Sequence, residues 1–333
     1  MLISLDGNFR ITTLSNCYII HYLCKVKGVV IKTTGKRYTV KTEVGDIVQS
    51  RLKGKFRIAG IKSTNPIVVG DKVEVVQESE LWMIVKLHDR KNHILRKSVN
   101  LSKQTHIIAA NIDQAILMIT LDSPVTTTGF IDRFLVAANA YGVEVVLLFN
   151  KVDLLNDELK FQQEKLKKVY EKIGYTCFST SVINDDLSQI KELMKGKVNM
   201  ISGHSGVGKS TLINKLQPDL DINTKEVSDT HQQGQHTTTF SELHELDFGA
   251  SIIDTPGIRG FGLVELEVAE LGSYFPEFFK LKSQCKFHNC IHKNEPHCAV
   301  KSALENGEIA ESRYKNYLNM LVEEEEHFRT NNY

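Results

Sequence analysis

The sequence predicts several domains in a fixed order: an all-β domain, an α/β domain with a mostly parallel sheet, and a small helical domain. Three observations predict this order. Short strand patterns fill residues 27–96, strands alternate with helices from about residue 98, and three of the six cysteines gather within residues 285–298. A chain of 333 residues can form two or three domains. We expect an N-terminal extension and three domains, at residues 1–25, 26–97, 98–278 and 279–333.

The composition is that of a globular protein, with 41% hydrophobic and 24% charged residues. No apolar run approaches the roughly 20 residues that a membrane helix needs. Residues 17–24 are apolar, but they lack a basic leader and a small-residue cleavage site, so we expect an extension without assigned role, not a signal peptide. The cysteines cluster with histidines, which favours metal binding in a reducing compartment and a cytoplasmic protein.

The first domain is expected to be a small barrel of the OB type. Turn residues separate short runs of β-branched and aromatic residues, and five such strands in about 70 residues fit this barrel. The expected strands are residues 28–31, 37–40, 56–58, 72–76 and 82–85.

The barrel segment is strongly basic. Residues 27–97 hold 16 Lys and Arg against 7 Asp and Glu, a net charge of +9. Alternating basic side chains share one face of a strand or extended loop. Such a face protects an exposed sheet edge or binds nucleic acid, and the excess across the whole domain favours nucleic acid. Few aromatic residues accompany it, which favours recognition of RNA phosphates and shape over base stacking. The alternating residues are Arg51, Lys53, Lys55 and Arg57.

The second domain alternates buried strands with amphipathic helices, a rhythm typical of a parallel sheet covered on both faces. The expected strands are residues 113–120, 143–149, 175–178, 197–202 and 250–254. The expected helices are residues 129–141, 157–173 and 210–216.

A phosphate-binding loop lies between one of these strands and the helix that follows it. The pattern G-x-x-x-x-G-K-S lets backbone N–H groups surround phosphate oxygens, with the helix N-terminus behind them. Lys209 adds a positive charge for the outer phosphates, and Ser210 can bind Mg²⁺. The candidate residues are Gly203, His204, Ser205, Gly206, Val207, Gly208, Lys209, Ser210 and Thr211.

A second motif, N-K-V-D, ends an earlier strand. The carboxylate of Asp153 can accept two hydrogen bonds from guanine, whereas adenine lacks that donor pair, so the motif indicates GTP and GDP. Asn150 can tie this loop to the phosphate loop, and the stem of Lys151 can cover the base. The backbone near Ser179 and Thr180 fits a loop that contacts the guanine oxygen. The four residues of the motif are Asn150, Lys151, Val152 and Asp153.

Two further segments are expected to respond to the nucleotide. Asp254 ends a strand and is placed to hold Mg²⁺, while the N–H of Gly257 can reach the γ-phosphate. One of Thr237 and Thr238 ligates Mg²⁺ in the GTP form; spacing leaves both open, and we take Thr238. Because Asn150 precedes Gly203 by 53 residues, the motif order of an ordinary GTPase is circularly permuted.

The C-terminal cysteines have the spacing of a closed tetrahedral zinc site. Cys285, Cys290 and Cys298 offer three thiolates, and His292 offers the imidazole; His288 and His297 are alternatives. A closed site has no open position for water, so we expect a structural metal. Helices are expected at residues 299–305 and 308–328.

In the combination and order of these motifs, the chain resembles the RsgA (YjeQ/YloQ) family of circularly permuted GTPases. The resemblance runs from about residue 27 to the C-terminal helix. It implies GTP hydrolysis stimulated by the small ribosomal subunit, a role in late maturation of that subunit, and rRNA contacts from the barrel and zinc domains. The motifs that carry it, in order, are the basic barrel, residues 150–153, 203–210, 234–239, 254–257 and 285–298.

The residue after Gly257 is Ile258, which cannot orient an attacking water as the glutamine of Ras-like enzymes does. We therefore expect slow intrinsic hydrolysis and take His236, with Lys209 and Thr238, as the catalytic set. The expected protein is a monomer that binds neither DNA nor membrane. Two alternatives stay open: a permuted GTPase acting on another ribosomal particle, and an RNA-binding module with a regulatory nucleotide site.

Overall fold

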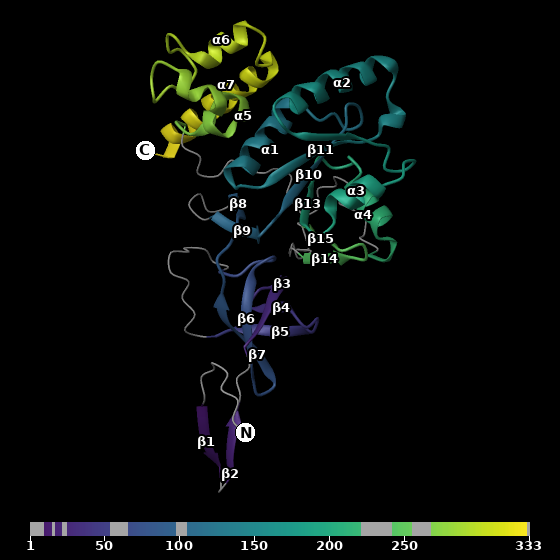
Figure 1. Ribbon diagram of the computed structural model, residues 1–333, viewed down its shortest axis with the longest axis vertical. Coiled ribbons are helices and arrows are strands. Elements are labelled where there is room, and N and C mark those ends of the chain that lie inside the picture. Colours follow the sequence, from purple (N-terminus) through teal and green to yellow (C-terminus); the bar gives the residue numbers. More distant parts are fainter. Residues whose placement is uncertain are drawn as a thin grey trace.

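The computed structural model describes residues 10–14, 17–21, 25–53, 66–97, 105–220, 242–254 and 268–331. Its parts follow one another along the long axis of the molecule (Figure 1). An antiparallel hairpin of β1 (Arg10–Leu14) and β2 (Cys17–His21) lies at one end. The barrel and the α/β domain come next, and the C-terminal helices lie at the other end.

The barrel has five strands and closes on itself, as predicted. Its strands run in the order β3-β4-β5-β7-β6, and β3 pairs again with β6. Alternate residues such as Val30, Val40 and Ile84 point inward and are fully buried. The strands are β3 (Val26–Thr34), β4 (Arg37–Thr42), β5 (Ile47–Leu52), β6 (Lys72–Glu78) and β7 (Leu81–Leu87).

Strand β5 is the barrel strand that sequence reasoning missed. Its inward positions include Ser50, which is 1% exposed, so the apolar alternation that marks a half-buried strand is weak there. The strand expected at residues 56–58, with Lys55 and Arg57, lies outside the described residues.

A short hairpin joins the barrel to the α/β domain. It pairs β8 (His93–Lys97) with β9 (Thr105–Ala110), and neither strand was expected. Just before β8, buried Asn92 donates to the carbonyl of Ile112 at 2.8 Å and accepts from its N–H at 2.9 Å. These bonds fix the hairpin against the start of the α/β sheet.

The α/β domain contains the predicted parallel sheet, with helices on both faces. Its order is β12-β11-β10-β13-β15-β14, and only β14, at the end of this order, is antiparallel to its neighbour β15. The strands are β10 (Gln114–Ile119), β11 (Glu144–Phe149), β12 (Thr176–Ser179), β13 (Val198–Ser202), β14 (Glu242–Leu246) and β15 (Ala250–Asp254).

Successive residues of the central strands serve opposite faces of the sheet. Leu117 and Leu147 pack with helices α1 and α2, whereas Met118 and Leu148 pack with α3 and α4. Both layers are therefore apolar, which explains why the strands read as continuous hydrophobic runs. The helices are α1 (Thr128–Ala140), α2 (Asp157–Lys172), α3 (Ser188–Met194) and α4 (Lys209–Leu216).

The C-terminal domain consists of two short helices and one long helix, α7, around an aromatic core. Phe275, Phe278 and Tyr317 are fully buried and contact one another, with ring centroids 5.0–5.4 Å apart. Within the described ranges, every helix is too short or too polar to span a membrane. The helices are α5 (Pro276–Leu281), α6 (Ala299–Glu305) and α7 (Glu311–Asn331).

Candidate nucleotide site and metal centre

The phosphate loop connects β13 to α4, and its glycines are required by the backbone. Gly203 and Gly208 have φ values of 143° and 106°, which other residues rarely adopt. A Cβ on Gly203 would lie 2.6 Å from the carbonyl oxygen of Met118, and one on Gly208 would lie 2.5 Å from Nδ2 of Asn150. The loop therefore packs tightly against the ends of the neighbouring strands.

Lys209 is held over the loop that it follows. Its Nζ donates to the carbonyl oxygens of Gly203 at 3.0 Å and His204 at 2.8 Å. Ser210 is half-buried in the first turn of α4, where N–H groups without helical partners are found. The ammonium, the hydroxyl and these N–H groups form a cluster of donors suited to phosphate oxygens.

Asn150 joins three loops that are far apart in the sequence. Its side chain is buried, and its Nδ2 donates to the carbonyl oxygen of Val207 at 2.8 Å. Its Oδ1 accepts from the N–H of Val182 at 3.0 Å. The contact between the N-K-V-D loop and the phosphate loop that the sequence predicts is therefore present.

The rest of the N-K-V-D motif faces outward. Lys151 has a left-handed backbone, with φ of 63°, and its Nζ donates to the carbonyl oxygen of Ser123 at 2.6 Å. Asp153 lies in the short 3-10 helix Val152–Leu154 and is exposed. Its carboxylate accepts no hydrogen bond from the described residues, so its acceptors are available to a ligand.

The loop after β12 is held by hydrogen bonds to Asp185, a residue that the sequence analysis missed. A carboxylate oxygen of Asp185 accepts from the N–H of Ser181 at 2.6 Å and from the hydroxyl of Thr180 at 3.1 Å. The carbonyl of Thr180 accepts from the N–H of Val152 at 3.3 Å. This loop therefore lies beside the N-K-V-D loop, while the hydroxyl of Ser179 is engaged by Gln163.

Another contact that the sequence did not indicate supports the phosphate loop from the side. The ring of His204 packs against Phe130 of α1, with centroids 4.0 Å apart. Burial, together with the positive charge of Lys209, lowers the pKa of His204. The neutral imidazole is therefore favoured in the folded protein.

The segments expected to respond to the nucleotide lie mostly outside the described residues. His236, Thr237, Thr238, Gly257 and Ile258 belong to residues 221–241 and 255–267. The backbone of Asp254 ends β15, which pairs in parallel with β13. The carboxyl end of β15 is therefore next to the start of the phosphate loop.

The structure gathers the four predicted metal ligands. The ligand atoms of Cys285, Cys290, His292 and Cys298 lie within 4.8 Å of one another. Nδ1 of His292 is 3.4–3.7 Å from the three sulfur atoms. A tetrahedral ion with metal–sulfur bonds of about 2.3 Å and metal–nitrogen bonds of about 2.1 Å requires sulfur–nitrogen separations of about 3.6 Å. The donors therefore fit such an ion.

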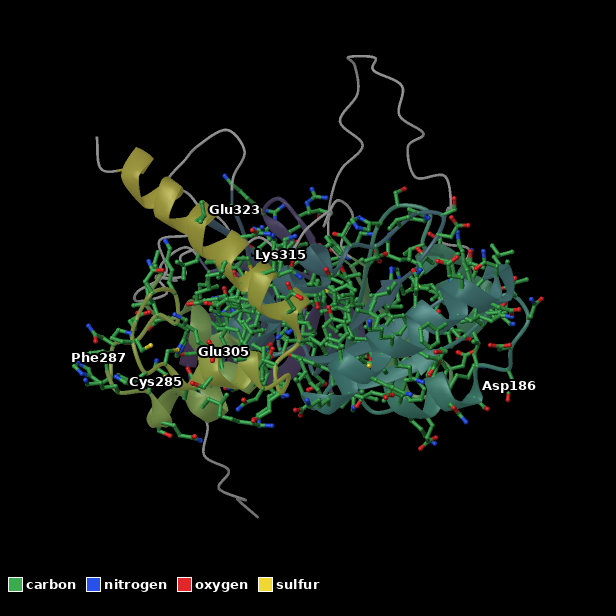
Figure 2. All side chains as sticks on the ribbon, turned by 90° about the horizontal axis from the view of Figure 1, so that it is seen from above. Asp186, Cys285, Phe287, Glu305, Lys315 and Glu323 are labelled. Carbon is green, nitrogen blue, oxygen red and sulfur yellow. The ribbon has the colours of Figure 1, made fainter. Side chains whose placement is uncertain are left out.

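The peptide around this centre is fixed by hydrogen bonds. The hydroxyl of Tyr314 donates to the carbonyl of His292 at 2.8 Å, and His292 itself has a left-handed backbone. Burial raises the pKa of the Cys290 thiol to about 12, so a bound cation is needed to keep it as a thiolate. The expected alternatives, His288 and His297, are not part of the cluster. Figure 2 shows Cys285 at the opposite end of that view from Asp186 in the α/β domain.

Two protein-family models match the chain. The RsgA GTPase model matches residues 87–264, and the model of the RsgA N-terminal domain matches residues 27–81. The two matches together span the barrel and the α/β domain.

Similar proteins match over nearly the whole chain. A protein of Flavobacterium johnsoniae named small ribosomal subunit biogenesis GTPase RsgA is 58% identical over 311 residues, covering 92% of this chain and 96% of its own. A Bacteroides fragilis protein with the same name is 50% identical, covering 90% and 98%. Among solved structures, YjeQ from Thermotoga maritima has a TM-score of 0.75 at 36% identity, covering 90% and 98%.

The structure of YloQ, described as a circularly permuted GTPase, has a TM-score of 0.73 at 30% identity, covering 91% of this chain and 96% of its own. This likeness agrees with the order of the motifs here, in which the strand ending in N-K-V-D precedes the strand before the phosphate loop. The prediction of a permuted α/β GTPase fold is thus confirmed.

Proposed function

The chain belongs to the RsgA family of GTPases, and we propose that it hydrolyses GTP on the small ribosomal subunit and assists the late maturation of that particle. The observation that carries this proposal is the hydrogen bond from Asn150 to Val207. It joins a base-recognition loop to a phosphate loop in one site. The relatives named above carry the subunit in their names, which supports the choice of partner.

Guanine recognition is assigned to Asp153. Its free, exposed carboxylate can accept from the two N–H donors on one edge of guanine. Lys151 is anchored to Ser123 through its ammonium, so its aliphatic stem is fixed next to the base position. The backbone near Ser179 and Thr180 completes the base site.

The phosphates and Mg²⁺ are assigned to the other loops. The N–H groups of residues 203–211 and the ammonium of Lys209 hold the phosphates, while Ser210, Thr238 and Asp254 hold Mg²⁺. Mg²⁺ would neutralise charge between the β- and γ-phosphates. Gly257 contacts the γ-phosphate. His236 is the proposed group that orients the attacking water, in place of the side chain that Ile258 cannot supply.

The barrel is proposed as an rRNA-binding domain. Arg51 is exposed on β5 beside the outward-facing Gln49. Lys53, however, is paired with Glu78 at 2.6 Å, so part of the positive charge on this face is compensated within the barrel. The contribution of Lys53 to RNA affinity should accordingly be smaller than that of Arg51.

The C-terminal centre is proposed to hold one structural zinc ion. Three thiolates and an imidazole are the ligands of closed zinc sites, and the nitrogen–sulfur separations fit. We also infer that the domains divide as residues 26–97, 98–278 and 279–333, after an extension at 1–25, in a cytoplasmic monomer.

The proposal is tested by measuring GTP turnover with and without purified small subunits, with ATP and large subunits as controls. We expect slow turnover of GTP alone, a large increase with small subunits, and no turnover of ATP. Lys209→Ala should abolish the activity, and His236→Ala should remove the stimulation while leaving GTP binding intact. Stimulation by large subunits alone would indicate another ribosomal particle. Binding without turnover under every condition would indicate an RNA-binding module with a regulatory nucleotide site.

A further inference from the structure

Helix α1 has a side that belongs to the C-terminal domain. Its residues at i, i+3, i+4, i+7 and i+10 share one side of the helix. Val136 packs in the C-terminal core with Phe275 and Tyr317, and Asn139 donates to the carbonyl of Tyr274 at 2.9 Å. Figure 1 shows α1 between the sheet and helices α5 and α7. The residues of this side are Gly129, Asp132, Arg133, Val136 and Asn139.

A buried charge network connects this side of α1 to α5 and α7. Asp132 and Arg313 are 0% and 1% exposed. Nη1 of Arg313 donates to Asp132 at 2.6 Å, while its Nε and Nη2 donate to Glu277 at 2.7 and 3.1 Å. Asn316 and Tyr170 also donate to Asp132, at 2.6 and 2.7 Å. Each carboxylate oxygen of Asp132 is thus bonded, which fixes its position.

The two carboxylates around Arg313 also keep its guanidinium charged. Burial alone would lower the pKa of Arg313, but Asp132 and Glu277 outweigh burial and raise it. Its guanidinium remains a cation and also lies over the ring of Phe275, 4.5 Å from the centroid. A planar guanidinium can bond two carboxylates in fixed directions, which an ammonium cannot do.

The other end of the connection is the nucleotide site. Phe130, two residues before Asp132 on the same helix, contacts His204 of the phosphate loop. The carbonyl of His204 in turn accepts from Nζ of Lys209. The loop that precedes α1 carries Ser123, whose carbonyl holds Lys151 of the N-K-V-D motif. The start of α1 therefore contacts the phosphate loop, and the loop before α1 holds Lys151 of the N-K-V-D motif.

We propose that Arg313 is a positioning residue of the nucleotide site, acting through Asp132 and helix α1 on Phe130 and the phosphate loop. The inference rests on the proposed GTP site and adds a residue of the C-terminal domain to the groups that determine nucleotide affinity. It also connects the metal centre to nucleotide affinity, because Arg313 lies over Phe275, which packs in the same core as Cys290 and Cys298.

The test measures the affinity of the full-length, metal-loaded protein for GDP with Mg²⁺ by titration calorimetry, below the onset of thermal unfolding. Arg313→Lys keeps the charge but loses the planar guanidinium that donates to both Asp132 and Glu277. Phe130→Leu keeps an apolar side chain but removes the ring contact with His204. We expect each to weaken GDP binding about fivefold, as in other connected sites. Arg133→Ala is the matched control, since it breaks an exposed ion pair to Glu323 between the same two helices. It should leave affinity unchanged.

A double variant separates positioning from simple structural support. If both residues act through the same contacts, the double variant Arg313→Lys, Phe130→Leu should weaken GDP binding by clearly less than the product of the two single effects. A lower melting temperature with unchanged affinity in Arg313→Lys would overturn the proposal, as would independent effects in the double variant. If Arg313→Lys does not fold, Asp132→Asn replaces it in the same cycle. Absence of GDP binding by the unaltered protein would instead reject the proposed function.

Discussion

The α/β domain meets its two neighbours in different ways. On the barrel side, the charged contact of Glu242 with Lys32 joins β14 to β3, and its side chains are 35% and 42% exposed, while Val69 packs with Ala109 in the apolar core of the α/β domain. Lys41 pairs with Glu245 in a similar exposed setting. On the C-terminal side, a shared apolar core encloses the network around Arg313.

This difference determines how much free energy the charged contacts contribute at each junction. Exposed ion pairs contribute about 0–1 kcal/mol, whereas removing one partner of a buried pair costs about 3–5 kcal/mol. The charged contacts on the C-terminal side are therefore costly to break, whereas those between β14 and the barrel are weak. Because β14 lies between residues 221–241 and β15, these exposed ion pairs are also the contacts nearest in sequence to the segment that we propose responds to the nucleotide.

The largest effect should come from Asp132→Ala, which leaves the buried guanidinium of Arg313 with one carboxylate. We expect the free energy of unfolding of the α/β and C-terminal domains, which contain the helices, to fall by about 3–5 kcal/mol. Helical circular dichroism reports this transition, while the fluorescence of Trp82, the single tryptophan, reports the barrel. The Trp82 signal should shift less than the helical signal; equal shifts in both signals would show that the barrel and the helical domains unfold together.

Removal of the metal ligand Cys298 should have an intermediate effect. Cys298→Ser should abolish binding of one zinc ion per chain and lower the helical transition, because Cys298 belongs to the C-terminal core. The control is Cys177→Ser in β12. Burial raises the pKa of the Cys177 thiol to about 12, and this residue lies outside the cluster. Zinc content, measured by atomic emission, should stay at one in the control; loss there would show that the ligand assignment is incomplete.

The smallest effect is expected at the barrel junction. A double-mutant cycle of Lys32→Ala and Glu242→Ala should give a coupling free energy below about 1 kcal/mol, and it should decline in 1 M salt because both groups are partly exposed. Chemical unfolding followed by Trp82 fluorescence measures it. A salt-insensitive coupling of several kcal/mol would contradict the view that this ion pair is weak.

Sequence reasoning succeeded where the chemistry is local. The phosphate loop and the metal cluster each lie within 14 residues, so spacing alone defines them, and His292 was correctly placed with the three cysteines. The alternating elements of the α/β domain were also predicted, because strands buried on both faces are uniformly apolar.

It failed where the fold brings distant residues together. Arg313 and Asp132 are 181 residues apart, and each alone reads as an ordinary charged residue on a helix. The contact of Phe130 with His204 depends on how α1 packs on the sheet. Strand β14 has polar residues because it lies at the end of the parallel sheet, beside the barrel, so its pattern did not predict a strand.

The most direct test of the nucleotide site is the base specificity of Asp153→Asn. Asparagine offers an N–H donor where the carboxylate offered an acceptor, and xanthine has a carbonyl where guanine has its amino group. The unaltered protein should bind GDP and not xanthosine diphosphate, and the variant should reverse this preference while its circular dichroism stays unchanged. A variant that still prefers GDP would contradict the assignment of Asp153 to guanine and, with it, the permuted GTP site described for this chain.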